Sequence, residues 1–323
     1  MSGSLPLTVI VGPTASGKSA LAEALAGQFP AQLVSADALQ VYRGLDVGTA
    51  KPSSRTRAAV RYHGLDLLAP TGRCTAGDYA RVARAAIAEI RAVGQLPVLV
   101  GGSGFYIEAT VNGIAPLPPA DPAWRSALTA LRERRGVGRL HEILQRLDPV
   151  RAAAIGVRDA QRIMRSLEIV LRTGRPMQRV TGTGPGCTPE GLEPLAAPIL
   201  WLGISWPREE LVVRIERRVD AMLEAGWLEE VETLLAAGLD PGTHALQAIG
   251  YRQLVAVVRG QADLDSARAQ IVIATRRYAK RQASWFRRLT QIEWLRVSER
   301  GAGMSVAAAH EAVIERLRSF VAC

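Results

Sequence analysis

Cysteine is scarce in this sequence, and the cysteines that are present lie far apart. Cys74, Cys187 and Cys323 are the only three in 323 residues, and none belongs to a C-x-x-C pair or has a histidine nearby at metal-ligand spacing. This pattern indicates neither a zinc site nor a disulfide framework. It fits a reducing compartment such as the cytoplasm.

Long apolar segments are missing as well. No stretch reaches the ~20 apolar residues that a transmembrane helix needs, and strand-like residues begin at Leu7, leaving no room for a signal peptide. The sequence therefore predicts a soluble protein of the cytoplasm. Hydrophobic residues still make up 48% of the chain, which is enough for the core of two domains or of one large domain.

Acidic residues are outnumbered by basic ones. The chain has 30 Asp and Glu against 40 Lys and Arg, a net charge of +10, and arginine supplies nearly all of the positive charge. Such a surplus suits contact with a phosphate-rich partner such as nucleic acid. The alternative is that arginine simply occupies solvated faces in a chain rich in Ala and Arg.

A glycine-rich loop is the strongest motif present. An apolar run over residues 7–11 precedes it and a helical pattern over residues 20–26 follows, which matches strand, G-x-x-x-x-G-K-[ST], helix without a mismatch. Backbone N–H groups of such a loop close around phosphate oxygens, Lys18 reaches a terminal phosphate, and Ser19 is a candidate Mg²⁺ ligand. We call this loop the phosphate cradle; it consists of Gly12, Pro13, Thr14, Ala15, Ser16, Gly17, Lys18 and Ser19.

Two further predicted strands end in polar or glycine-rich segments. The strand over residues 31–34 leads to Asp37, and the strand over residues 97–100 leads to Gly101-Gly102-Ser103-Gly104. Because ligands lie beyond the carboxyl ends of strands in an open parallel sheet, we expect Asp37 and Ser103 near the cradle. Asp37 is then a candidate general base and Ser103 a candidate phosphate ligand. An N-cap or turn role for Asp37 is the alternative.

The middle of the chain changes from alternating strands and helices to helices alone. A proline-rich segment at 116–122 marks a boundary, helical patterns follow at 123–135, 137–147 and 159–173, and a glycine-rich linker spans 181–186. An apolar strand over 198–204 then resumes the sheet. We therefore predict a P-loop NTPase-like α/β core, a parallel sheet flanked by helices, from residues 1–115 and 197–323. The remainder, 116–196, is predicted to be an all-helical insertion domain.

Arginine is concentrated on two predicted helices. Like charges on one helix face repel each other, so an arginine ridge in the insertion favours an external anion such as a phosphate backbone over plain solvation. The segment 274–288 has six basic residues, no acid and three interleaved aromatics, a composition typical of surfaces that bind single-stranded nucleic acid. The alternative is that some of these rings lie in the core. The ridge consists of Arg158, Arg162, Arg165 and Arg172, and the aromatics are Tyr278, Trp285 and Phe286.

A helix predicted over residues 207–222 has Pro207 and two acids at its start and carries Arg214. In P-loop phosphotransferases an arginine on a helical segment can clamp the transferring group. Arg214 is therefore a candidate for that role by analogy.

Several motifs together resemble those of the tRNA dimethylallyltransferases, also called tRNA isopentenyltransferases. The resemblance rests on the cradle and on segments 35–44, 48–52, 101–104, 161–168, 247–251 and 276–282, which extend over nearly the whole chain. Eukaryotic members often add a C-terminal zinc finger. This sequence has none, and so it resembles the bacterial type.

The resemblance implies transfer of a dimethylallyl group from dimethylallyl diphosphate to N6 of the tRNA adenosine just 3′ of the anticodon. The cradle would then bind the diphosphate, Asp37 would take the proton from the amine, and Ser103 and Arg214 would stabilise the leaving group with Mg²⁺. The target base would be flipped into a channel. Relatives act as monomers. The implied tRNA contacts are Asp37, Ala38, Leu39, Gln40, Ser103, Arg125, Gln161, Arg162, Ile163, Met164 and Arg165, to which the basic segment adds Arg277, Lys280 and Arg281.

Two other functions remain open from the residues alone. A small-molecule kinase using ATP would share the cradle and the acid, but it would need neither the arginine ridge nor the basic segment. An apolar run ending in Asp-Glu, which many ATP-hydrolysing P-loop proteins carry, is also missing. A non-catalytic RNA-binding P-loop protein would not need Asp37.

Overall fold

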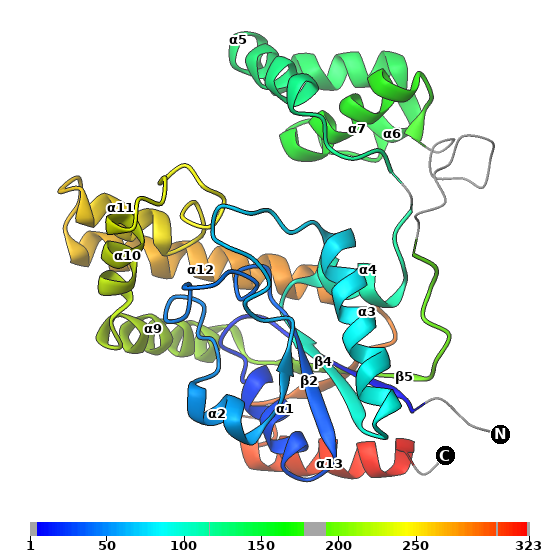
Figure 1. Ribbon diagram of the computed structural model, residues 1–323, viewed down its shortest axis with the longest axis vertical. Helices are drawn as coiled ribbons and strands as arrows, with labels where there is room; N and C mark the ends of the chain where they lie inside the picture. Colours follow the sequence, from blue (N-terminus) through cyan, green and yellow to red (C-terminus); the bar gives the residue numbers. More distant parts are fainter. Residues whose placement is uncertain (1–4, 116, 178–191, 302, 322–323) are drawn as a thin grey trace. The chain divides into compact units, whose positions relative to one another are not determined.

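The computed structural model describes residues 5–115, 117–177, 192–301 and 303–321 (Figure 1). The chain divides into two compact units, a larger one formed by Met1–Val111 and Leu195–Cys323 and a smaller one formed by Asn112–Pro194. The predicted domain boundaries fall at 116 and 196. The predicted linker at 181–186 lies outside the described residues, as do Cys187 and Cys323, whereas Cys74 is a free thiol.

The larger unit is built on a six-stranded parallel sheet with the strand order β3-β2-β4-β1-β5-β6. Its central strand β1 pairs with β4 on one side and β5 on the other, and every residue of β1 is buried. The strands are β1 (Leu7–Val11), β2 (Ala31–Ala36), β3 (Tyr62–His63), β4 (Leu96–Gly101), β5 (Ile199–Ser205) and β6 (Glu293–Arg296).

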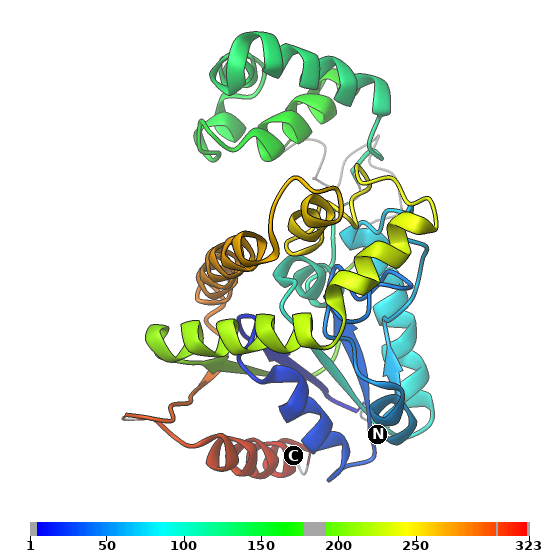
Figure 2. The ribbon, with the colours of Figure 1, turned by 90° about the vertical axis from the view of Figure 1, so that its left-hand side faces the viewer.

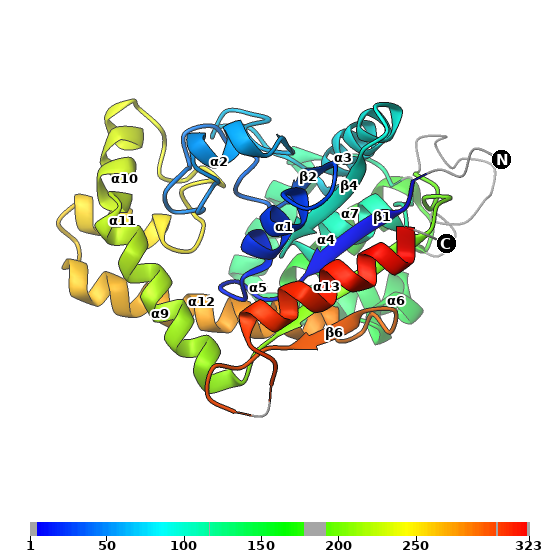
Figure 3. The same cartoon turned by 90° about the horizontal axis from the view of Figure 1, so that it is seen from below.

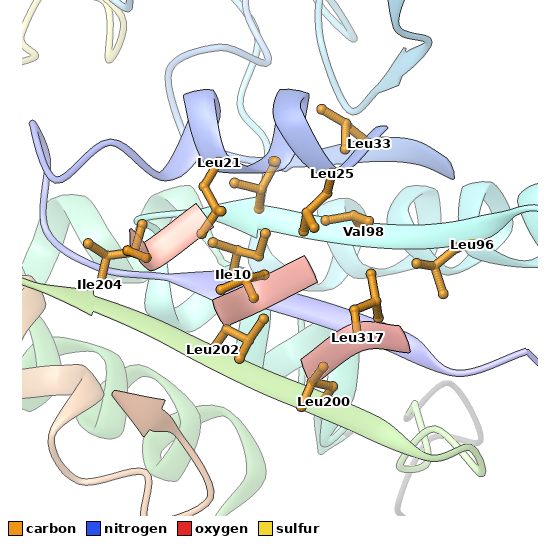
Figure 4. Packing of buried hydrophobic residues seen from close by; sticks show 14 of the residues in the cluster. Ile10, Leu21, Leu25, Leu33, Leu96, Val98, Leu200, Leu202, Ile204 and Leu317 are labelled. Atoms are coloured by element: carbon orange, nitrogen blue, oxygen red, sulfur yellow. The ribbon is translucent and has the colours of Figure 1, made fainter. Parts of the chain in front are cut away.

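Helices cover both faces of this sheet. On one face α1 and α13 lie side by side (Figure 3), and Leu21, Leu25 and Leu317 pack against Ile10 and Leu202 of the strands (Figure 4). On the other face α3 contacts β2 and β4. The helices of this unit are α1 (Lys18–Ala26), α2 (Ser54–Ala59), α3 (Ala76–Ala92), α4 (Gly104–Val111), α9 (Arg208–Glu224), α10 (Trp227–Ala236), α11 (Tyr251–Val258), α12 (Leu264–Phe286) and α13 (Val306–Val321).

The predicted fold class is confirmed, because the four predicted strands are present as the centre of a parallel sheet flanked by helices. The edge strands β3 and β6 were not predicted. They have two and four residues, and neither contains a fully buried residue, so no apolar run marks them. None of the described helices combines the length and hydropathy needed to cross a membrane.

The described part of the smaller unit has three helices, α5 (Pro122–Leu147), α6 (Pro149–Ala153) and α7 (Ala160–Thr173), and one isolated antiparallel bridge between Ile114 and Leu192. Gly136 has a φ of +78° and breaks α5, which fits the two helices predicted on either side of it. Asp159 caps the start of α7, and Gly174, with a φ of +64°, ends it. Leu140, Leu144 and other apolar side chains of the three helices form a core that is separate from that of the larger unit.

Candidate active site

The phosphate cradle connects β1 to α1 at the carboxyl end of the central strand. Gly17 immediately precedes α1 and has a φ of +93°. Glycine adopts this left-handed conformation readily, whereas other residues do so rarely. At Gly12 a Cβ atom would lie 2.7 Å from the carbonyl oxygen of Ile204, so a side chain there would push β1 away from β5. The loop therefore needs both glycines. It places the N-terminus of α1, a favourable position for an anion, at the carboxyl end of the sheet.

Lys18 is the charged side chain of the cradle. Its Nζ donates a hydrogen bond to the carbonyl oxygen of Pro13 at 2.8 Å. Burial and the positive charge of Arg218 lower the pKa of Lys18 to about 7, and the negative charge of Asp37 acts in the opposite direction. Three sequence-distant charged groups thus act on one another beside the cradle.

Asp37 lies just after β2. Its Oδ1 accepts the backbone N–H of Leu39 at 2.8 Å and, more weakly, that of Gln40 at 3.4 Å. The turn role considered from the sequence is therefore present. Among the described residues no hydrogen bond reaches Oδ2, so one carboxylate oxygen remains available to accept a proton from a ligand.

The second glycine turn, residues 101–104, lies next to Asp37. The backbone N–H of Ser103 donates to the carbonyl oxygen of Ala36 at 3.1 Å, and Ser103 Oγ accepts the N–H of Ala38 at 3.0 Å. A Cβ at Gly101 would lie 2.1 Å from the Ala36 carbonyl oxygen. The structure thus joins the ends of β2 and β4 and brings Ser103 to the segment that carries Asp37, as the sequence predicts.

Tyr278 of α12 completes this part of the site. Burial and the negative charge of Asp37 raise the pKa of Tyr278 to about 12, while Ser103 and Gln282 act in the opposite direction. The phenol therefore stays protonated at neutral pH and can serve as a hydrogen-bond donor.

Arg214 supports the cradle from α9, but its donors are partly engaged. Its Nε donates to the carbonyl oxygen of Ala15 at 2.9 Å, and one terminal nitrogen pairs with Glu299 at 3.1 Å. The guanidinium also stacks on Trp206, whose indole N–H donates to the Ser16 carbonyl oxygen. These contacts explain how Arg214 holds the loop; its predicted role as a clamp on the transferring group stays a prediction.

Arg218, one helical turn after Arg214, was missed by the sequence reasoning. No ion pair within the described part of the chain involves it, yet its charge acts on Lys18 and it interacts electrostatically with Asp37. Burial lowers the pKa of Arg218, and Asp37 counteracts this. Its spacing of four residues from Arg214 on the same helix face is the signal that would have found it.

The donors beside the cradle fit a magnesium ion held through a phosphorylated ligand. Ser19 is exposed at the start of α1, and the buried Ser16 Oγ has no hydrogen-bond partner among the described residues. Where residues are described, His, Cys, Asp and Glu nowhere form a metal-binding group of three or more. Mg²⁺ often takes only one or two protein oxygens and completes its coordination with phosphate oxygens and water, so Ser19 suits such a site.

The basic segment of α12 presents two different faces. Arg277, Lys280 and Arg281 are exposed. Phe286 is fully buried, and Trp285 lies against Gly104. Phe286 follows the alternative considered from the sequence, that some of these rings lie in the core: four residues after the inward-facing Gln282, it lies on the side of α12 that packs into the core.

Three of the four ridge arginines have carboxylate partners within the protein. Arg165 pairs with Glu168 at 2.9 Å, Arg162 with Asp159 at 3.5 Å, and Arg172 with Asp121 at 3.9 Å. Carboxylates of the same unit thus compensate three of the four charges of the ridge and relieve the repulsion that favoured an external anion, and RNA binding by the ridge stays a prediction.

The other predicted RNA contacts of the smaller unit differ in exposure. Gln161 and Arg162 are exposed, and Arg125 is partly exposed and pairs with Glu168 at 3.4 Å. Ile163 is fully buried in the unit's core, and Met164 packs against the same cluster. The Ile163 side chain therefore cannot contribute to an RNA-binding surface, because the amphipathic pattern of α7 turns it inward.

The glycine and proline of residues 47–52 predict a surface loop able to touch ligand, and contacts within the protein hold this loop in place. The Glu230 carboxylate accepts the backbone N–H groups of Asp46 at 2.6 Å and Val47 at 2.7 Å. Lys51 pairs with Asp46 and Asp66. The charge of Lys51 is thus used in ion pairs within the protein.

The parallel sheet, the cradle before α1 and the acid after β2 place this chain in the class of P-loop-like α/β proteins. A family model described as IPP transferase matches residues 40–289. A tRNA dimethylallyltransferase of Thermomicrobium roseum is 42% identical over 298 residues, which cover 92% of this chain and 88% of that protein. The chain belongs to the IPP transferase family, and the family suggested by the sequence motifs is confirmed.

Solved structures agree with this assignment. The full-length tRNA isopentenylpyrophosphate transferase of Bacillus halodurans matches with a TM-score of 0.68 and 31% identity, over 98% of this chain and 96% of that one. A eukaryotic dimethylallyltransferase solved acting on tRNA matches with a TM-score of 0.76 over 98% of this chain and 80% of its own. At 22% identity, this second likeness concerns the fold alone.

Proposed function

We propose that this protein transfers the dimethylallyl group of dimethylallyl diphosphate to N6 of the adenosine 3′-adjacent to the anticodon in tRNA, giving N6-(dimethylallyl)adenosine and diphosphate. Its family and its relatives support an enzyme of this kind. One observation carries the proposal: the cradle, Asp37 and Ser103 follow β1, β2 and β4, and they lie together at the carboxyl end of the sheet.

In this proposal the chain's own residues divide the work between the two substrates. The cradle N–H groups, Lys18 and Arg218 hold the diphosphate and stabilise the negative charge that grows as the carbon–oxygen bond breaks. Asp37 accepts the proton that N6 loses as the nitrogen–carbon bond forms. Ser103 orients the segment that carries Asp37. Mg²⁺ held by Ser19 and the diphosphate oxygens would supply further charge neutralisation.

The partner in this proposal is the anticodon stem-loop. The exposed Arg277, Lys280 and Arg281 of α12 suit contact with its backbone, and binding there would offset the few kcal/mol that flipping the adenosine costs. We infer that the protein acts as a monomer in the cytoplasm, where tRNA is found.

Substrate choice tests the proposal against an ATP-dependent kinase, which the curated relatives do not favour. The protein is incubated with an anticodon stem-loop and either labelled dimethylallyl diphosphate or labelled ATP. We expect label to pass to the RNA from dimethylallyl diphosphate only. Tight ATP binding without prenyl transfer would contradict the proposal.

Asp37→Asn tests the proton acceptor. We expect kcat to fall by about 100-fold or more while the Kd values of both substrates change little, because an amide cannot take the proton. Asp240→Asn is the matched control, since Asp240 also accepts the N–H two residues ahead, at 2.8 Å from Gly242. Equal kcat values for both variants would leave Asp37 with its turn role only.

A further inference from the structure

Gln282 of α12 joins the two glycine-rich loops of the site. Its Oε1 accepts the backbone N–H of Thr14 in the cradle at 2.8 Å, and its Nε2 donates to the carbonyl oxygen of Gly102 at 3.0 Å. The side chain is 6% exposed. A single buried amide thus connects the loops that follow β1 and β4, from a position 180 residues beyond Gly102 and 268 beyond Thr14.

Both bonds require an amide in this orientation. The Thr14 N–H needs an acceptor and the Gly102 carbonyl needs a donor, so the two partners fix which end of the Gln282 side chain is oxygen and which is nitrogen. A glutamate would place a second oxygen against the Gly102 carbonyl and add negative charge beside the cradle. A methionine of similar length would leave both backbone groups buried without partners.

The glycine at 102 is explained by the same contact. Gly102 is not among the glycines with positive φ, so its backbone alone does not demand glycine. A Cβ there would lie 2.2 Å from Gln282 Nε2, and its next nearest neighbours from other residues would be at ordinary contact distance. Position 102 therefore has no room for a side chain because the Gln282 amide occupies that space.

The residues one turn before and after Gln282 on α12 face the same loop. Tyr278 interacts with Ser103, and Trp285 lies so close to Gly104 that a Cβ there would be 2.4 Å from its ring. Arg277 and Arg281 are exposed, and the Arg281 guanidinium lies 5.7 Å from the centroid of the Tyr278 ring. Figures 1 and 2 show α12 (orange) running past α4, the helix that begins at Gly104. The side of α12 that carries Tyr278, Gln282 and Trp285 thus covers the second glycine turn, while the neighbouring arginines stay exposed and suit contact with RNA.

We infer that Gln282 is a positioning residue that holds the cradle and the second glycine turn in register and thereby couples RNA binding on α12 to diphosphate binding. The inference rests on the proposed function. It predicts that an anticodon stem-loop strengthens the binding of inorganic diphosphate about tenfold in the unsubstituted protein, within the usual range of coupling between two sites.

Gln282→Met tests the coupling. The Kd of inorganic diphosphate is measured with and without the stem-loop, together with kcat and the Kd of the RNA alone. We expect the coupling to fall below about twofold and kcat to drop at least tenfold, with unchanged RNA affinity. A purely structural role would not remove coupling selectively.

Gln32→Met is the matched control, because it makes the same change at a buried glutamine of the larger unit. Gln32 lies near the start of β2 and hydrogen-bonds Gln95 and His63. We expect it to lower thermal stability and to keep the coupling. Coupling equal to that of the unsubstituted protein in Gln282→Met, or its absence from the unsubstituted protein, would overturn the inference.

A double-mutant cycle tests the contact between Gly102 and Gln282 by measuring kcat alone. Gly102→Ala should lower kcat about as much as Gln282→Ala does, because the new Cβ displaces the amide. The double variant should be no worse than either single one, since alanine at 282 leaves room for that Cβ. Additive losses would overturn the inference. Failure of the unsubstituted protein to prenylate RNA would instead contradict the proposed function.

Discussion

Lys18 links the chemistry of the site to pH. Because its pKa is about 7 in the protein and 10.5 is the ordinary value, Lys18 is largely neutral above about pH 8. A bound diphosphate favours the ammonium form, so binding above neutrality takes up a proton, whereas below about pH 6 the proton is already present. Affinity for diphosphate should therefore fall as pH rises above about 7.

Titration calorimetry in buffers of different ionisation enthalpy measures this proton uptake. Relative to Lys18→Arg, whose side chain stays charged, we expect the unsubstituted protein to take up an additional fraction of a proton approaching one at about pH 8.5, and none at about pH 5.5. The comparison removes the protonation of diphosphate itself. Identical uptake by both proteins at the higher pH would show that Lys18 is already charged.

Arg218 differs from its neighbour Arg217 in what surrounds it. Arg217 is exposed, whereas Arg218 acts on Lys18 and interacts with Asp37. We expect Arg218→Gln to lower kcat/KM about 100-fold, because it removes one of the donors that stabilise the developing negative charge. Arg217→Gln should change kcat/KM by less than about twofold. Steady-state kinetics with an anticodon stem-loop measures both. Similar losses in the two variants would point to bulk charge.

The sequence predicts best the positions of site residues that directly follow a strand or belong to a loop motif. The cradle motif and the strand ends predict where Asp37 and Ser103 lie. In a parallel sheet all strands end on the same side, so residues that directly follow the strands lie near one another. Arg218 and Gln282 escape prediction because their role depends on which face of a long helix turns inward. That face is set by packing against loops from distant parts of the sequence.

At the scale of elements, α5 and α7 are joined by a buried carboxylate. Glu168 is 1% exposed, accepts the backbone N–H of Asp121 and pairs with Arg165. Burial would raise the pKa of Glu168, but the hydrogen bonds from Asp121 and Arg165 outweigh it and hold the pKa below its usual value. The carboxylate therefore stabilises the smaller unit above the unfolded-state pKa, and this stability is lost as pH falls through the lower folded-state value.

Glu168→Gln should reduce the unfolding free energy of the smaller unit by about 2 kcal/mol at neutral pH. The exposed pair of Arg139 and Glu142 on α5 provides the control, since Glu142→Gln should cost less than about 0.5 kcal/mol. Denaturant unfolding followed by hydrogen exchange of α5 and α7 measures both. The effect of Glu168→Gln should shrink below about pH 4; a pH-independent difference would contradict the assigned charge.

The elements themselves were predictable to different degrees. The central strands read as continuous apolar runs because both of their faces are buried, and Gly136 separates two helices because its positive φ interrupts the helical path. The short edge strands β3 and β6 depend on pairing with β2 and β5, which no local pattern records.

At the scale of the whole molecule, the net charge of +10 predicts RNA binding that weakens steeply with salt. Arg281→Gln should reduce the slope of log Kd against log salt by about one, and Arg259→Gln, a change at the exposed residue that follows α11, should leave it unaltered. Fluorescence titration of a labelled stem-loop over a salt series measures both slopes. Equal slopes for the two variants would mean that charge acts without a defined α12 surface.

The strand order has a consequence for synthesis on the ribosome. The two neighbours of β1 are β4 and β5, and the whole smaller unit is encoded between them. The smaller unit has local helical contacts and can fold as it emerges, whereas β1 keeps one unpaired edge until residue 205 has left the exit tunnel. The central strand, in which every residue is buried, thus waits for its second partner while the whole insertion is synthesised, and nascent chains that stall within the insertion are the ones most exposed to aggregation.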